Sequence, residues 1–206
     1  MSYDPPRPAG RLLLTPEDDE APARTARLRE LGLGERPEPA LDAFADHLAE
    51  LTGAPYAMVN FLDENRQFFA GLHRPERDVL NVDTAAPAAS PAAAAGAGER
   101  VRREVGRCLE RGHGFCPYVL ARRKALVLED VRDYPRFAGN PVVDEYGIRS
   151  YLGAPLVDST HMVLGTVCVV AMEPRPWGRA GLDAIKTAAA DLAPRLELHG
   201  PGGLRR

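Results

Sequence analysis

The hydrophobic positions change period along the chain, from the spacing of a helix to that of strands. Between residues 37 and 51, apolar side chains recur every three or four positions, which is typical of one buried helix face, and Gly53 is expected to end this helix. The runs 56–62 and 66–72 flank the polar triplet 63–65, which predicts a β-hairpin. The helix face comprises Leu41, Phe44, Ala45, Leu48 and Leu51.

The first 34 residues precede this pattern. Residues 1–14 are polar and rich in proline, so we expect them to be disordered. A helix is predicted over 15–34, because Thr15 is a suitable N-cap and the acidic run that follows suits the positive end of a helix. We expect this helix to end at Gly32 or at the glycine two residues later.

The pattern of apolar positions that predicts strands stops after Leu72, and regular structure is predicted again from Phe115. Residues 83–98 are mostly alanine, proline, glycine and serine, which have too little bulk to build a core, so this segment is interpreted as a mobile low-complexity insertion. A short helix is predicted after it, over 99–111. Residues 126–128 then form a short apolar run, predicted to be a strand.

The last third of the chain predicts a small helix, a second hairpin and a long helix. Asn140 and Pro141 are a suitable cap and first turn for a helix reaching Tyr146. Residues 150–157 and 163–172 are apolar strands on either side of a polar turn. The final helix is predicted from Arg179, with Leu182, Ile185, Ala189, Leu192 and Leu196 facing inward and Pro194 kinking or ending it.

These elements together predict an α+β protein in which an antiparallel sheet carries helices on at least one face. Residues 198–206 lie beyond the pattern and are expected to be a disordered tail. The length of 206 residues suits one well-cored domain with extensions.

Composition and charge exclude several classes of function. The net charge is −3, and no basic block is longer than three residues, so we expect no nucleic-acid binding. The longest apolar stretch has about ten residues, half of what a membrane span requires, and the N-terminus does not resemble a signal peptide. The three cysteines form no disulfide framework. We therefore expect a cytoplasmic protein without membrane contact.

Few residues are candidates for metal binding, phosphate binding or catalysis. His113 and Cys116 have the spacing of two metal ligands, but no second pair accompanies them, so no metal is predicted. The glycine pairs lack a phosphate-binding context, and the paired carboxylates at turns, such as Glu129 and Asp130, face no obvious partner. No serine has the glycine frame of a nucleophile elbow. We therefore expect no catalytic residues.

Two cysteines and one strand remain of interest. Cys168 lies among valines, where cysteine packs as a small hydrophobe, while Cys116 is expected near the end of a loop, where a thiolate is favoured. Packing is the preferred interpretation, and a redox pair would require the two to be adjacent in space. Arg149 and Tyr151 alternate along a predicted strand and are expected to face one way. They would hold a small anion or polar ligand, or fix the loop 133–140.

Several motifs occur in order at plausible spacing. They are Phe115-Cys-Pro-Tyr-Val119, the stretch 126–130, Tyr134-Pro-Arg-Phe-Ala-Gly-Asn-Pro141, Gly147-Ile-Arg-Ser-Tyr-Leu-Gly-Ala-Pro-Leu156, Leu164-Gly-Thr-Val-Cys-Val-Val170 and Pro174-Arg-Pro-Trp177. With them, residues 37–197 resemble the GAF domain family, and in particular a bacterial subgroup that shares these motifs. The resemblance implies an antiparallel sheet with terminal helices on one face, often used for dimerisation, and a pocket on the other.

By position, the resemblance implies that the pocket is lined by Tyr118, Phe137, Arg149, Tyr151 and Cys168. It names no cofactor, because GAF domains bind cyclic nucleotides, haem, bilins, small anions or nothing known. We expect a stand-alone sensory or regulatory protein that binds a small molecule or a signalling partner and catalyses nothing. It is expected to form a homodimer through the N-terminal and final helices.

Two alternatives stay open. One is a thiol-based redox enzyme or sensor, similar to methionine sulfoxide reductases, that uses Cys116 with Cys108 or Cys168. The other is a structural dimerisation adaptor whose pocket is filled by its own side chains and binds no ligand.

Overall fold

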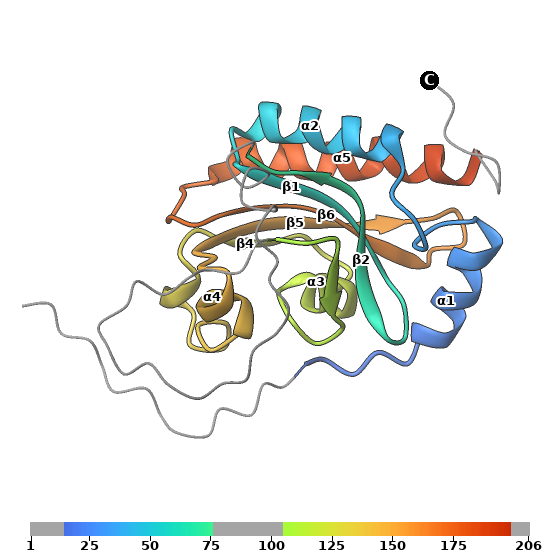
Figure 1. Cartoon of the computed structure of the whole chain (residues 1–206), viewed down its shortest axis with the longest axis horizontal. Helices are drawn as coiled ribbons and strands as arrows, with labels where there is room; N and C mark the ends of the chain where they lie inside the picture. Colours follow the sequence, from blue (N-terminus) through green and yellow to red (C-terminus); the bar gives the residue numbers. More distant parts are fainter. Residues whose placement is uncertain (1–14, 76–104, 199–206) are drawn as a thin grey trace, which may run out of the picture.

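An antiparallel sheet forms the centre of the protein (Figure 1). The computed structural model describes residues 15–75 and 105–198, and within these residues six strands pair in the order β3-β2-β1-β6-β5-β4. The strands are β1 (Tyr56–Leu62), β2 (Arg66–His73), β3 (Cys108–Glu110), β4 (Leu126–Leu128), β5 (Ser150–Val157) and β6 (Val163–Ala171). Both predicted hairpins, β1–β2 and β5–β6, are confirmed, and the pairing of β1 with β6 joins them into one sheet.

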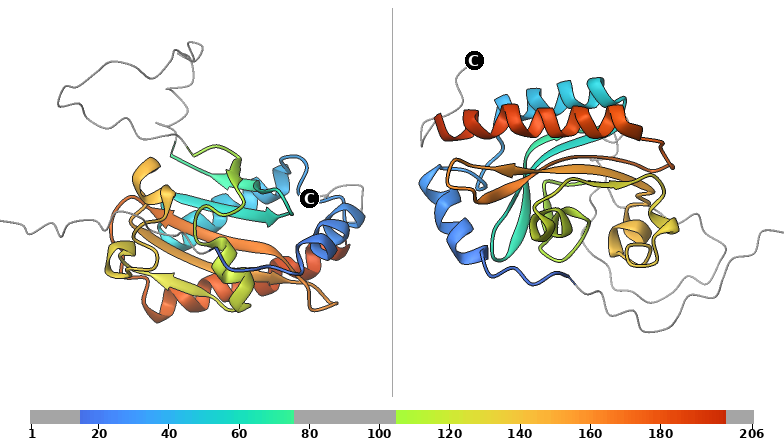
Figure 2. Two further views of the ribbon diagram at one scale, coloured as in Figure 1. Left: turned by 90° about the horizontal axis from the view of Figure 1, so that it is seen from below. Right: turned by 180° about the vertical axis from the view of Figure 1, so that it is seen from behind.

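Helices cover both faces of this sheet. The long helices α2 (Pro39–Thr52) and α5 (Gly178–Leu198) lie on one face, and the short helices α3 (Cys116–Arg122) and α4 (Pro141–Glu145) lie on the other (Figures 1 and 2). Helix α1 (Ala21–Glu30) packs at one end of the sheet. Every residue of β1 and β6 is buried, and apart from Asn60, Gly165 and Thr166 their residues are apolar. The predicted α+β architecture is confirmed.

Local sequence signals set the ends of α2 and α4 as predicted. Helix α2 begins at Pro39, and Gly53 stops it in a left-handed conformation with φ of 63°. The side-chain oxygen of Asn140 accepts a hydrogen bond from the backbone N–H of Val142, which caps α4, and Pro141 occupies its first turn.

Two glycines allow close approach, one between a helix and the sheet and the other between two strands of the sheet. A side chain at Gly71 in β2 would collide with the backbone of Leu41 in α2, because an added Cβ would lie 2.2 Å from the Leu41 carbonyl oxygen. At Gly165 in β6, an added Cβ would lie 2.0 Å from the carbonyl oxygen of Asn60 in β1. The junction between the two hairpins therefore depends on a residue without a side chain.

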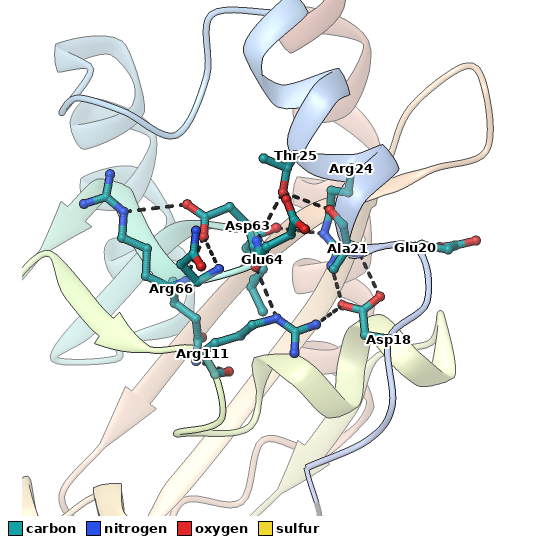
Figure 3. Close-up of polar contacts among 12 residues, drawn as sticks. Asp18, Glu20, Ala21, Arg24, Thr25, Asp63, Glu64, Arg66 and Arg111 are labelled. Carbon is teal, nitrogen blue, oxygen red and sulfur yellow. Dashed lines mark hydrogen bonds and ion pairs between the residues drawn. The ribbon is translucent and has the colours of Figure 1, made fainter.

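Helix α1 is attached by a buried arginine (Figure 3). Arg24 is 1% exposed, and its Nε donates a hydrogen bond of 2.7 Å to the carbonyl oxygen of Leu62, while its other nitrogens pair with Asp18. Arg111 also donates to Asp18, at 2.7 Å, and to the carbonyl oxygen of Asp63. The polar groups around α1 therefore hold it to the turn between β1 and β2.

This network explains why the first helix begins later than predicted. The prediction placed Thr15 at the cap, whereas α1 begins at Ala21 and the hydroxyl of Thr15 bonds to the carbonyl oxygen of Gly112. Asp18 pairs with Arg24 and Arg111 and does not supply the first turn of a helix. The expected end is confirmed, because the helix stops before Gly32, which has φ of 68°.

Three further predictions about elements are wrong. Leu51 is 55% exposed and does not share the buried face of α2. Residues 108–110, expected in a helix, form β3, because the edge of β2 offers them backbone partners. Leu198, expected in the disordered tail, is the last residue of α5. Residues 116–122, for which no element was predicted, form α3, so Cys116 follows the end of a loop as expected.

Helix α5 continues through Pro194, where an end or a kink was predicted. Pro194 and Ala190, whose carbonyl loses its helical partner, both lie on the exposed side of the helix, where water can hydrogen-bond to that carbonyl. No helix in the described ranges combines the length and the apolar character needed to cross a bilayer. Residues 1–14, the insertion at 83–98 and the tail from 199 lie outside the described residues.

Candidate functional site

A small chamber lies between the sheet and the α3–α4 layer. Its volume is about 40 Å³, and its wall includes Met58 of β1, Phe115 and Cys116 at the start of α3, and Cys168 and Val170 of β6. A water molecule needs about 10–15 Å³ measured in this way, so the chamber has room for a few water-sized molecules. In this conformation it is far too small for a nucleotide.

Two sulfurs meet at this chamber. The Sγ atoms of Cys116 and Cys168 are 3.8 Å apart, and both residues are buried. The Tyr151 hydroxyl lies 3.5 Å from the Cys116 sulfur. Cys168 is held in the middle of the sheet, opposite Met58 of β1 and Gly153 of β5. The adjacency that a redox pair requires is therefore present in the fold.

Gly153 allows Tyr151 to reach the sulfurs. Both residues face the chamber side of β5, and the tyrosine side chain lies along the strand over the glycine. A Cβ added at Gly153 would lie only 2.2 Å from the Tyr151 hydroxyl oxygen. The ring of Phe115 packs against the tyrosine at 5.2 Å between ring centroids. The tyrosine side chain thus occupies space that only a glycine at position 153 leaves free.

The three buried groups influence one another's ionisation. The hydrogen bond with Cys168 lowers the pKa of Cys116 to about 6, although burial acts in the opposite direction. The same hydrogen bond, together with burial, raises the pKa of Cys168. Burial raises the pKa of Tyr151 well above its usual value, and the neighbouring thiols add to this effect. Cys116 is therefore the thiol that ionises first, and Tyr151 remains a neutral donor.

Polar residues of the strands lie beside the thiols. Asn60 and Thr166 are opposite each other in β1 and β6, and both are fully buried. Among the described residues, Asn60 Oδ1 and Thr166 Oγ1 have no hydrogen-bond partner. Buried polar atoms without partners are uncommon in native proteins. They mark this part of the sheet as a place where a further polar group would be stabilised.

Gln67 holds one wall of the chamber. Its side-chain oxygen accepts from Asn60 Nδ2 at 2.9 Å, and its Nε2 donates to the carbonyl oxygens of Glu110 and His113. These bonds tie the segment after β3 to the sheet. Asn60, Gln67 and Thr166 were not among the predicted site residues, although a polar residue inside an apolar strand is the signal that would have found them.

The structure places the five predicted site residues in different surroundings. Tyr151 and Cys168 line the chamber. Tyr118 and Phe137 pack edge to face at 4.8 Å in the layer above it, with the guanidinium of Arg136 over the Tyr118 ring. Neither of these two aromatic residues is part of the chamber wall.

Arg149 does not face the chamber with Tyr151. Strand β5 begins at Ser150, so the expected alternation does not apply to Arg149. Its guanidinium pairs with the carboxylate of Asp130, with Nε 3.1 Å from Oδ1. This hydrogen bond lowers the pKa of Asp130, and it outweighs the partial burial that acts against ionisation. Arg149 therefore does not fix the loop 133–140 by a direct hydrogen bond, because its partner Asp130 precedes that loop.

The fold and the chamber define an α+β domain with a buried site beneath α3. The sequence profile of the GAF domain matches residues 36–196. The chain therefore belongs to the GAF domain family. A cyclic di-GMP phosphodiesterase of Pseudomonas aeruginosa is 31% identical over 164 residues, which cover 78% of this chain and 22% of the relative. The chain thus spans about a fifth of that protein.

Solved structures share the fold. The GAF domain of a phosphoenolpyruvate-protein phosphotransferase from Coxiella burnetii has a TM-score of 0.54 at 16% identity, covering 87% of this chain and 94% of its own. A free methionine-R-sulfoxide reductase from Neisseria meningitidis has a TM-score of 0.53 at 14% identity, covering 88% and 93%. At these identities the likeness concerns the fold alone.

The contact between Tyr151 and Gly153 gives a testable coupling. We expect Gly153→Ala to lower the free energy of unfolding by about 1–3 kcal/mol, because the new methyl group displaces the phenol. In a Tyr151→Leu background the same substitution should cost much less. A double-mutant cycle in urea measures this difference. Equal costs in the two backgrounds would show that the tyrosine does not lie over the glycine.

The Asp130–Arg149 pair gives a testable dependence on pH. At pH 7 the carboxyl is ionised in both the folded and unfolded chains, so the pair contributes in full, and we expect Asp130→Asn to cost about 1 kcal/mol. Below about pH 4 the unfolded chain takes up the proton first, and this contribution is lost as the pH falls through the lowered pKa of the folded state. Urea unfolding at pH 7 and pH 3 should show the gap between wild type and variant closing. A gap that is unchanged would contradict the pairing.

Proposed function

We propose that this GAF domain is a sensory or regulatory module that binds a small molecule in the chamber beneath α3 and does not transform it. Small-molecule sites are mostly apolar cavities with a few well-placed polar groups. The chamber has this character, because apolar side chains surround the Tyr151 hydroxyl, the two thiols and the Gln67 amide. The observation that carries the proposal is a pair of buried polar atoms without partners, Asn60 Oδ1 and Thr166 Oγ1, on the strands that carry the cavity residues Met58 and Cys168.

The wall of the chamber indicates the class of ligand. Among the described residues that line it, none is arginine, lysine, aspartate or glutamate. An anionic ligand such as a cyclic nucleotide would lose its hydration there without gaining an opposite charge. The Arg149 guanidinium, for which anion binding was one of two predicted roles, pairs with Asp130. We therefore favour a small uncharged molecule with one or two hydrogen-bonding groups.

Binding of anything larger than a few atoms requires the wall to move. The edge strand β3 is the weakest part of that wall, because it has three residues and pairs only with β2 in the described sheet. Short elements at a sheet edge open at low free-energy cost. We propose that the ligand enters by displacement of β3 and the segment that follows it.

The motif subgroup and the partners belong to the same proposal. The motifs between Phe115 and Trp177 favour membership of the bacterial subgroup, and relatives such as the phosphodiesterase contain much more chain than this one. We propose that the signal passes to a protein partner or to a second copy of this chain, through exposed sides of α1 and α5. An adaptor role without a ligand is the competing function.

Native mass spectrometry of the protein purified from its own host tests the proposal. We expect a bound small molecule, and the same spectrum reports whether the chain is a dimer.

Val170→Ile adds one methyl group to the chamber wall and should reduce the bound fraction without lowering the unfolding midpoint, because it fills empty space. Val169→Ile makes the same change on the opposite face of β6 and should leave the bound fraction unchanged. Wild-type protein without any bound molecule would favour the adaptor.

A further inference from the structure

Cys116 and Cys168 meet in the interior although they are 52 residues apart in the chain. We propose that these two thiols form a reversible disulfide when a small peroxide enters the chamber, so that the domain responds to oxidants. This inference rests on the sulfur geometry and requires no bound ligand. It therefore goes beyond the small-molecule binding proposed above.

The two sulfurs are placed for bond formation. A disulfide has an S–S distance of about 2.05 Å, so the sulfurs must come about 1.8 Å closer than their present 3.8 Å. Cys168 lies in β6, which is paired on both sides. Cys116 is the first residue of the short helix α3 and lies outside the sheet. We therefore expect Cys116 to make most of the movement, through side-chain rotation and a small shift of the helix.

The chamber decides which oxidants reach the pair. All three cysteines contribute to its wall, Cys116 and Cys168 as buried residues and Cys108 as an exposed one, and its volume of about 40 Å³ admits molecules little larger than water. Hydrogen peroxide meets this limit, whereas a bulky disulfide such as oxidised glutathione does not. Cys108 is exposed on β3 and is open to both kinds of reagent. Size selection therefore distinguishes the buried pair from the surface thiol.

The reaction balances with the peroxide as the oxidant. The Cys116 thiolate attacks one peroxide oxygen, the O–O bond breaks with its electron pair on the other oxygen, and that oxygen takes up a proton and leaves as water. Cys116 is then a sulfenic acid. The Cys168 sulfur attacks it, the S–S bond forms, and the hydroxide that leaves takes the Cys168 proton to give a second water. Two thiols have lost two electrons to one peroxide.

Tyr151 is a positioning residue for the first step. Its hydroxyl lies 3.5 Å from the Cys116 sulfur and can donate a hydrogen bond to the thiolate. Gly153 keeps the phenol in this place, as shown above. Loss of the hydroxyl in Tyr151→Phe should slow disulfide formation and raise the pH at which Cys116 becomes reactive, while the ring packing stays.

A movement of Cys116 would be transmitted to segments outside the chamber. The preceding residue, Phe115, packs edge to face on Phe137, with 5.8 Å between ring centroids. Gly114 exchanges two hydrogen bonds with the side chain of Asn140, at 2.9 and 2.8 Å, and Asn140 caps α4. Oxidation is therefore expected to move the loop that carries Phe137 and the start of α4.

Peptide mapping of the full-length protein tests the proposal. Reduced protein is treated with a small excess of hydrogen peroxide, the remaining thiols are alkylated with N-ethylmaleimide in denaturant, and the digest is analysed by mass spectrometry. We expect a peptide pair linked through Cys116 and Cys168, with Cys108 alkylated, and recovery of all three thiols after dithiothreitol. Oxidised glutathione should not produce this pair.

Substitution of each cysteine by serine distinguishes the roles of the three thiols. Cys108→Ser should form the disulfide at the wild-type rate, and Cys116→Ser should abolish it. Cys168→Ser should stop at a sulfenic acid on Cys116 that dimedone labels. Wild type and Cys108→Ser decide the question even where a core variant fails to fold. Oxidation confined to Cys108, a disulfide that contains Cys108, or three free thiols after treatment would each overturn the proposal.

Discussion

The pairing of β1 with β6 joins the two hairpins and creates the surfaces on which all the helices pack. Each strand belongs to its own hairpin, and the ladder between them turns two ribbons into one sheet with two buried faces. One face receives the long helices α2 and α5, and the other receives α3 and α4. Gly165 is essential to this ladder because its missing side chain leaves room for the backbone of Asn60. The same ladder places Asn60 and Thr166 opposite each other beside the chamber.

Much of this fold could be predicted because its main elements are long and regular. The helix face around Leu48 and the strands flanking Asp63 and Asp158 repeat often enough for their period to be read. The first helix was misplaced at its start because Asp18 pairs with Arg24 and Arg111, contacts that lie up to 93 residues away. Helix α3 and strand β3 have seven and three residues, too few to show a period. Their stability comes from packing on the sheet.

The candidate site was less predictable, since it depends on contacts between distant segments. Alternation along β5 correctly brings Tyr151 to the interior, but Arg149 lies one residue before the strand and pairs with Asp130. The contact between Cys116 and Cys168 joins a helix to a strand and leaves no local pattern in the sequence. The described residues that line the resulting chamber are uncharged, and this is why we propose a neutral ligand rather than the anion that an arginine would attract.

Amide hydrogen exchange of the native protein reports whether β1 and β6 open together, as they must if their pairing unites the sheet. If their pairing unites the sheet, the amides of Tyr56–Leu62 and Val163–Ala171 should exchange only through global unfolding, with the same free energy. The amides of the edge strand β3 should exchange through smaller openings. Exchange of β1 at a free energy well below that of β6 would show two hairpins that open independently, and would contradict the account.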